Sequence, residues 1–109
     1  MHSILLVDDE EEVTSLLKKR LEKRGFCCCE ATNGQKALDA LENASFHIVV
    51  MDVKMPVMDG ISALQVIHEQ YPDVKVILLS GHADMQLAVH AMQCGAFGYL
   101  MKPVELEEL

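Results

Sequence analysis

The feature that most constrains the fold is a short apolar run in the middle of the chain, at residues 48–51. Three of its four members are β-branched, and the run ends at Asp52, before a segment that contains Pro56 and Gly60. Continuous apolar runs of this length are typical of parallel strands that are buried on both faces. The sequence therefore predicts a central strand with Asp52 at its carboxyl end.

Four further apolar segments are predicted to be strands, and amphipathic segments separate them. The predicted strands cover residues 3–7, 26–31, 74–79 and 97–101, and the predicted helices cover 11–24, 34–43, 60–70 and 84–94. Strands that alternate with helices predict right-handed βαβ units, which form a parallel sheet with helices on both faces. The predicted fold class is therefore a doubly wound α/β fold with a five-stranded parallel sheet.

Apolar residues within the predicted helices recur at the spacing that places them on one face. The residues expected to face the core are Val13, Leu16, Leu17 and Leu21; Ala37, Leu38 and Leu41; Ile61, Leu64 and Ile67; and Met85, Ala88, Val89 and Met92. Gly25 and Gly95 follow the first and fourth helices as expected end signals. Residues 104–109 are expected to begin a last helix that is truncated.

Composition limits the possible functions. A chain of 109 residues with 50% hydrophobic content has room for one domain, residues 1–109, with its own core. The net charge of −8 argues against direct nucleic-acid contact and favours a cation or a basic partner. No apolar run approaches the roughly 20 residues that span a bilayer, and no signal peptide is evident, so a cytoplasmic location is expected.

Four cysteines are present, at residues 27–29 and at Cys94. Three consecutive cysteines suit neither a disulfide framework nor the spaced ligands of a zinc site. We expect them to pack in the core as small hydrophobic residues on alternate faces of a strand. His47 and His68 are expected to face solvent.

Polar residues end four of the predicted strands. Asp8 and Asp9 follow the first, Asp52 the third, Ser80 the fourth and Lys102 the fifth. Each could be an ordinary turn residue, but the carboxyl ends of parallel strands meet at one edge, where ligands bind. Crowded carboxylates require a cation, and all-oxygen donors suit Mg²⁺. With an ammonium and a hydroxyl nearby, the set predicts phosphoryl chemistry in which a carboxylate is the nucleophile.

Four motifs, LLVDDE, VVMDVKMPVMDG, LLSGHAD and YLMKP, occur in this order at the ends of four predicted strands. With them, the sequence resembles the receiver domain of bacterial two-component response regulators over essentially its whole length. The resemblance implies a flavodoxin-like fold with strand order 2-1-3-4-5. In that order the winding reverses between the strands that end at Asp8 and Asp52.

The resemblance also implies the roles of the site residues. Asp52 would be the phosphoacceptor, and Mg²⁺ would be held by Asp8, Asp9, Asp52 and the backbone carbonyl of Lys54. Lys102 would pair with the phosphoryl group and Ser80 would hydrogen-bond to it, while Tyr99 would turn inward as part of the switch. A family member of this kind would be a signalling switch that catalyses only its own phosphorylation and dephosphorylation.

The resemblance further implies the partners. These would be a sensor histidine kinase or a phosphotransfer protein and a downstream effector domain, expected to be transcriptional and absent from this chain. We expect no membrane contact, and a monomer or weak dimer.

Three other functions share parts of this pattern. A haloacid-dehalogenase-like phosphatase would carry a second Asp where this chain has Lys54. An FMN-binding flavodoxin-like protein would need a hydroxyl- and Gly-rich loop at residues 8–10, where this chain has three acids that repel phosphate. A receiver-like interaction module that is never phosphorylated remains the alternative, although such a module would more typically have lost one of the acids or Lys102.

Overall fold

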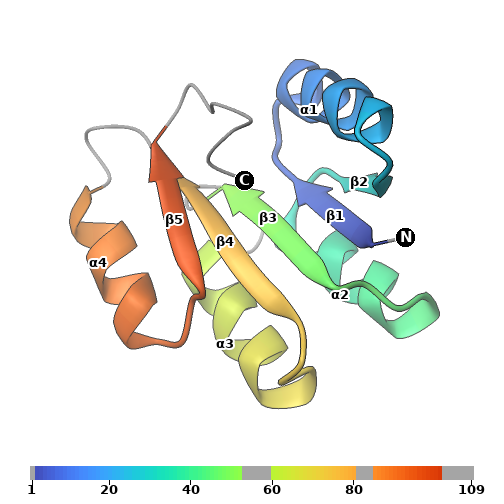
Figure 1. The fold of residues 1–109 in the computed structure, drawn as a ribbon. Helices are drawn as coiled ribbons and strands as arrows, with labels where there is room; N and C mark the ends of the chain where they lie inside the picture. The colour runs from blue at the N-terminus through green and yellow to red at the C-terminus, as the bar shows by residue number, and fades with distance from the viewer. Residues whose placement is uncertain (1, 53–59, 81–84, 102–109) are drawn as a thin grey trace.

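The computed structural model of the chain describes residues 2–52, 60–80 and 85–101. Within these ranges, five strands alternate with four helices (Figure 1). The strands are β1 (Ser3–Val7), β2 (Cys27–Ala31), β3 (Ile48–Asp52), β4 (Lys75–Ser80) and β5 (Gly98–Met101). The helices are α1 (Glu11–Lys23), α2 (Gly34–Asn43), α3 (Gly60–Gln70) and α4 (Met85–Gln93). The predicted last helix at residues 104–109 lies outside the described residues.

All five strands are parallel and form one sheet in the order β2-β1-β3-β4-β5. The fold class and the strand order expected from the sequence are therefore confirmed. The chain steps outward from β1 to β2, then returns past β1 to β3 and continues in one direction to β5 (Figure 1). The winding reverses beside β1, which is where a doubly wound sheet opens a crevice at its carboxyl edge.

Two hydrophobic cores cover the two faces of the sheet. Leu5 and Met51, among others, pack against residues of α2, α3 and α4 on one face. Ile4, Leu6 and Val50 pack on the other face against Leu17 and Leu21 of α1. Alternate residues of a strand point to opposite faces, so the uniformly apolar strands β1 and β3 serve both cores.

Local sequence signals favour the observed start of α2 and both ends of α1. The Asn33 side chain accepts a hydrogen bond from the backbone N–H of Lys36 at 2.8 Å, which caps the start of α2. Glu11 and Glu12 lie in the first turn of α1 and Lys23 in its last, so their charges oppose the helix dipole.

The predicted core faces of α1 and α4 are wrong at three positions. Leu16 is 51% exposed, whereas Thr14 of the same helix is buried. On α4, Val89 is 50% and Met92 41% exposed, and Ala91 is fully buried instead. The small Ala91 faces the core, whereas the larger Val89 and Met92 do not. The predicted core residues of α2 and α3 are buried or half-buried, as expected.

The expectation that the cysteines pack in the core holds for Cys28 alone among residues 27–29. Cys28 is buried in the core beside α1, and its thiol has a pKa raised to about 11, chiefly because of burial and then because of nearby Glu22. Cys27 and Cys29 are exposed on β2, which is an edge strand, whereas Ala31 further along the same face is buried.

Two positions at the amino edge of the sheet carry contacts that the sequence did not indicate. His47 is exposed as expected, but its Nδ1 accepts a hydrogen bond from the backbone N–H of Ser3 at 3.0 Å. Phe97, predicted to open β5, lies just before it and is 62% exposed, with the Lys75 ammonium 4.8 Å from its ring centre. None of the helices in the described residues is long and apolar enough to cross a bilayer.

Candidate functional site

Asp8 and Asp52 lie side by side at the carboxyl edge of the sheet. Val7 and Met51 are paired across β1 and β3, and each carboxylate residue follows one member of that pair. Neighbouring strands lie about 4.8 Å apart, so the two backbones are adjacent there. Asp8 is 1% and Asp52 7% exposed. The two acids that the sequence places at the reversal of the winding are therefore brought to adjacent, buried positions.

Asp8 also belongs to a group of three acids at the start of α1. Side-chain oxygens of Asp8, Asp9 and Glu10 all lie within 4.8 Å of one another, and Asp9 and Glu10 are exposed. The backbone N–H of Glu10 donates a hydrogen bond of 2.9 Å to Oδ1 of Asp8, which fixes the direction of that carboxylate. Hard oxygen donors at this spacing fit a divalent cation such as Mg²⁺.

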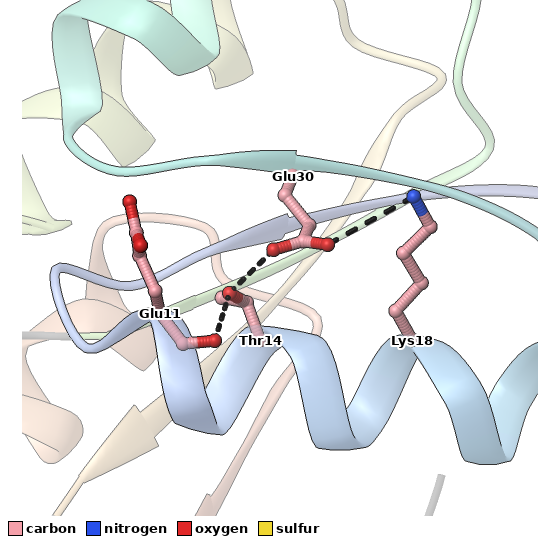
Figure 2. A network of polar contacts seen from close by, with 4 residues as sticks. All are labelled: Glu11, Thr14, Lys18 and Glu30. Carbon is pink, nitrogen blue, oxygen red and sulfur yellow. Dashed lines mark hydrogen bonds and ion pairs between the residues drawn. The ribbon is translucent and has the colours of Figure 1, made fainter.

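Hydrogen bonds to β2 hold this end of β1 and α1 in place. The backbone N–H of Asp8 donates to the carbonyl of Ala31 at 3.2 Å, which extends the β1–β2 pairing to the acid. One turn into α1, the Thr14 hydroxyl lies 2.8 Å from Oε2 of Glu30 and 3.1 Å from the carbonyl of Glu11 (Figure 2). Lys18 lies 3.8 Å from the other oxygen of Glu30. Thr14 and Lys18 therefore tie α1 to β2 close to the acid group.

The switch residues expected from the family resemblance lie on β4 and β5. Ser80 ends β4 one residue beyond Leu79, the residue paired with Asp52, and Ser80 is itself paired with Met101. The backbone of Ser80 is thus next along the same edge. Tyr99 is half-buried and packs against the core beside α3 and α4.

Part of the predicted site lies outside the described residues. This holds for Lys54 and Lys102 and for the side chain of Ser80. Their roles remain predictions. Glu10 was not predicted as a ligand, yet its carboxylate lies with those of Asp8 and Asp9. Its position directly after two acids at the end of a strand was the available signal.

The fold and the acid group define a doubly wound α/β protein with clustered carboxylates at the reversal of its sheet. The chain belongs to the response regulator receiver domain family, whose model matches residues 4–109. This confirms the resemblance drawn from the four sequence motifs.

Curated relatives are regulatory proteins, among them DNA-binding transcriptional regulators. The chain is 39% identical over 109 residues to the regulatory protein AtoC of Escherichia coli K12, which covers 100% of this chain and 24% of that protein. It is 36% identical over 106 residues to the DNA-binding transcriptional regulator NtrC of Proteus hauseri, covering 97% of this chain and 22% of that protein. The chain thus spans about a quarter of the length of these relatives.

Solved structures share the fold closely. A response regulator receiver domain protein from Clostridium thermocellum matches with a TM-score of 0.94 at 34% identity, covering 99% of this chain and 87% of that one. TrrA from Thermotoga maritima, solved with Mg²⁺ and BeF, matches with a TM-score of 0.87 at 30% identity, covering 99% and 92%. A Burkholderia pseudomallei response regulator with a phosphorylated aspartic acid and a calcium ion matches with a TM-score of 0.91 at 30% identity. The match covers 99% of this chain and 64% of that one.

Proposed function

We propose that this domain is a phosphoacceptor switch of a two-component system and that Asp52 is the residue that becomes phosphorylated. The observation that carries the proposal is that Asp52 is buried at the carboxyl edge of the sheet, adjacent to Asp8 of the acid group. A nucleophilic carboxylate needs a cation beside it, because the incoming phosphoryl group is itself anionic. Asp8 and Asp9 are placed where their carboxylates could hold such a cation.

The proposed reaction moves one phosphoryl group. An oxygen of the Asp52 carboxylate attacks the phosphorus of a phosphohistidine on a sensor histidine kinase or phosphotransfer protein, the P–N bond breaks, and the imidazole leaves. Asp8 and Asp9 would hold Mg²⁺ together with Asp52 and the carbonyl of Lys54, and the cation supplies positive charge to the phosphoryl oxygens. Hydrolysis of the acyl phosphate restores the carboxylate. The domain then acts as a switch and not as a metabolic enzyme.

The output of the switch is a change in packing at α4 and β5. The phosphoryl group adds negative charge and acceptor oxygens, which Ser80 and Lys102 would engage. Tyr99 is half-buried on β5 and contacts the core beside α4, so a shift of its ring changes the surface that a downstream effector domain meets. Similarity to AtoC and NtrC favours a transcriptional effector and a cytoplasmic setting for the exchange.

The test is phosphorylation by acetyl phosphate, followed by intact mass spectrometry. With Mg²⁺, the parent should gain the mass of one phosphoryl group, and the gain should vanish with EDTA and in Asp52→Asn. Asp73→Asn is the matched control, because Asp73 is an exposed acid in the turn before β4, at the opposite edge of the sheet. An adduct that persists in Asp52→Asn would refute the assignment. A parent that never gains the adduct would favour the interaction module.

A further inference from the structure

We propose a second metal site, for a borderline-soft divalent cation such as Zn²⁺, formed by His90 and Cys94 at the end of α4. These residues are four apart, so they lie on the same face of the last turn. Nε2 of His90 lies 3.6 Å from Sγ of Cys94. Imidazole nitrogen and thiolate sulfur are the ligands that Zn²⁺ prefers.

The distance between the two atoms matches the geometry of such a site. Zn–N bonds of about 2.05 Å and a Zn–S bond of about 2.3 Å, at a tetrahedral angle, place nitrogen and sulfur about 3.6 Å apart. The separation of 3.6 Å between His90 and Cys94 is therefore the spacing expected of two ligands of one zinc ion.

The surroundings of His90 and Cys94 allow a metal ion to reach them and offer a third possible ligand. His90 is exposed and Cys94 is half-buried, so water can reach both and fill open coordination positions. The side-chain amide of Gln65, on α3, lies 3.7 Å from Sγ of Cys94. Rotation of that amide by half a turn presents its oxygen, since the two orientations have nearly the same shape. The site would thus join α3 and α4.

This pair is separate from the acid group in place and in chemistry. The final turns of α3 and α4 lie at the end of the molecule away from the strand arrowheads, where Asp8 and Asp52 are found (Figure 1). Carboxylate oxygens favour Mg²⁺, whereas a thiolate with an imidazole favours Zn²⁺ or Co²⁺. The two sites can therefore be filled independently.

Co²⁺ titration of the reduced protein tests the proposal, with saturating Mg²⁺ present to occupy the acid group. Thiolate bound to Co²⁺ gives a sulfur-to-metal charge-transfer band in the near ultraviolet that carboxylates cannot give, and Zn²⁺ should abolish it by displacement. The band should be lost in Cys94→Ser, and His90→Ala should weaken binding by more than about tenfold, because even indirect partners of metal ligands cost that much.

Two variants serve as matched controls. Cys27→Ser/Cys29→Ser removes two exposed thiols on β2, and His47→Ala removes an exposed imidazole at the amino edge of the sheet. Both should keep the band and the affinity of the parent. Circular dichroism should show that every variant is folded. A band that survives in Cys94→Ser, or an affinity unchanged in His90→Ala, would overturn the proposal.

Discussion

Asp8 and Asp52 each stand one residue beyond a cross-strand pair, Val7 with Met51, and both are almost fully buried. Residues two apart in a strand point to the same face. Leu6 and Val50, two residues before Asp8 and Asp52, pack against α1, so both acids lie on the face of the sheet that α1 covers. Two acids on adjacent strands and the same face repel each other. This placement links function to stability, because a bound cation or the loss of one charge would reduce the repulsion between the two carboxylates.

The first prediction concerns Asp8→Asn. Charges within 4.8 Å of one another repel by roughly 1 kcal/mol per pair at the dielectric constant of water, a suitable value here because Asp9 and Glu10 are exposed. Asp8→Asn removes the pairs that Asp8 forms with Asp9 and Glu10, so in EDTA the free energy of unfolding of the variant should exceed that of the parent by about 1.7 kcal/mol. Asparagine keeps the oxygen that accepts from the N–H of Glu10.

Adding Mg²⁺ should reverse that order. At a hundred times its dissociation constant a ligand stabilises the folded parent by about 2.7 kcal/mol, and the variant should gain far less. Urea denaturation with and without Mg²⁺ measures both effects. Glu12→Gln is the control, since Glu12 is an exposed acid in the first turn of α1 but is not part of the acid group. Equal gains in the variant and the parent would contradict the role of Asp8.

The second prediction concerns the link between α1 and β2. Thr14→Val keeps the shape of a buried side chain but removes the hydroxyl that lies 2.8 Å from Glu30 (Figure 2). The free energy of unfolding should fall by about 1–3 kcal/mol, as expected when a hydrogen bond to a charged group is lost. Ser15→Ala, on the exposed side of the same turn, should change it by less than about 0.5 kcal/mol.

A double-mutant cycle with Glu30→Ala, which removes the acceptor, would attribute that loss. If the hydroxyl and the carboxylate interact as the structure shows, the two substitutions together should cost less than the sum of their separate effects. Strict additivity would mean that the loss comes from the Thr14 contact with the carbonyl of Glu11 alone.

The burial of Thr14 is a feature that could not be predicted from the sequence. The apolar spacing placed α1 correctly and predicted Leu17 and Leu21 inward, but it also predicted Leu16 inward. The helix presents Thr14 inward, and the Thr14 hydroxyl donates to Glu30 on a different element, β2. A partner 16 residues away cannot be read from the periodicity of one helix. Strand identity, by contrast, was predictable because continuous apolar runs report burial directly.

The candidate site was predictable for a related reason. Asp8 and Asp52 end strands, and the parallel fold alone brings strand ends to one edge, so their meeting followed from topology. The pairing of His90 with Cys94 was signalled only by a spacing of four residues within a helix, which many residue pairs share. Its approach to Gln65 depends on how α3 packs against α4, which local sequence does not encode.

The third prediction concerns the thiol of Cys28. Because it is buried and its pKa is raised to about 11, it should react with a thiol reagent far more slowly than Cys27 and Cys29, which are exposed. Variants that retain a single cysteine each, followed by absorbance with a chromogenic disulfide, separate the rates. Similar rates for Cys28 and Cys29 would contradict the burial.

Stability should also depend on pH through this thiol. The folded pKa of Cys28, about 11, lies above the ordinary value of 9.0, so the unfolded chain loses the proton first. The contribution of the neutral thiol is complete below pH 9.0 and is lost as pH rises to about 11. In that window the parent should lose stability faster than Cys28→Ala, by up to about 1.4 kcal/mol per pH unit. Parallel pH profiles would exclude the effect.

The last prediction compares two glycines that follow helices. Gly25 has φ +95° and Gly95 has φ +110°, a conformation that costs an L-residue roughly 1–2 kcal/mol. A Cβ at Gly25 would meet nothing within 4 Å, whereas one at Gly95 would lie 2.9 Å from the imidazole of His68. Gly25→Ala should therefore lower the free energy of unfolding only by the cost of the backbone conformation. Gly95→Ala should cost about 1 kcal/mol more, because the exposed ring must leave its preferred rotamer.

His68→Ala separates the cost of backbone strain at Gly95 from the cost of the contact with the His68 ring. In that background Gly95→Ala should cost no more than Gly25→Ala, because the ring that crowds the new Cβ is gone while the backbone strain remains. Urea denaturation of the four variants of this cycle gives the coupling energy directly. A cost at Gly95 that His68→Ala leaves unchanged would mean that the backbone, and not the imidazole, sets the requirement for glycine after α4.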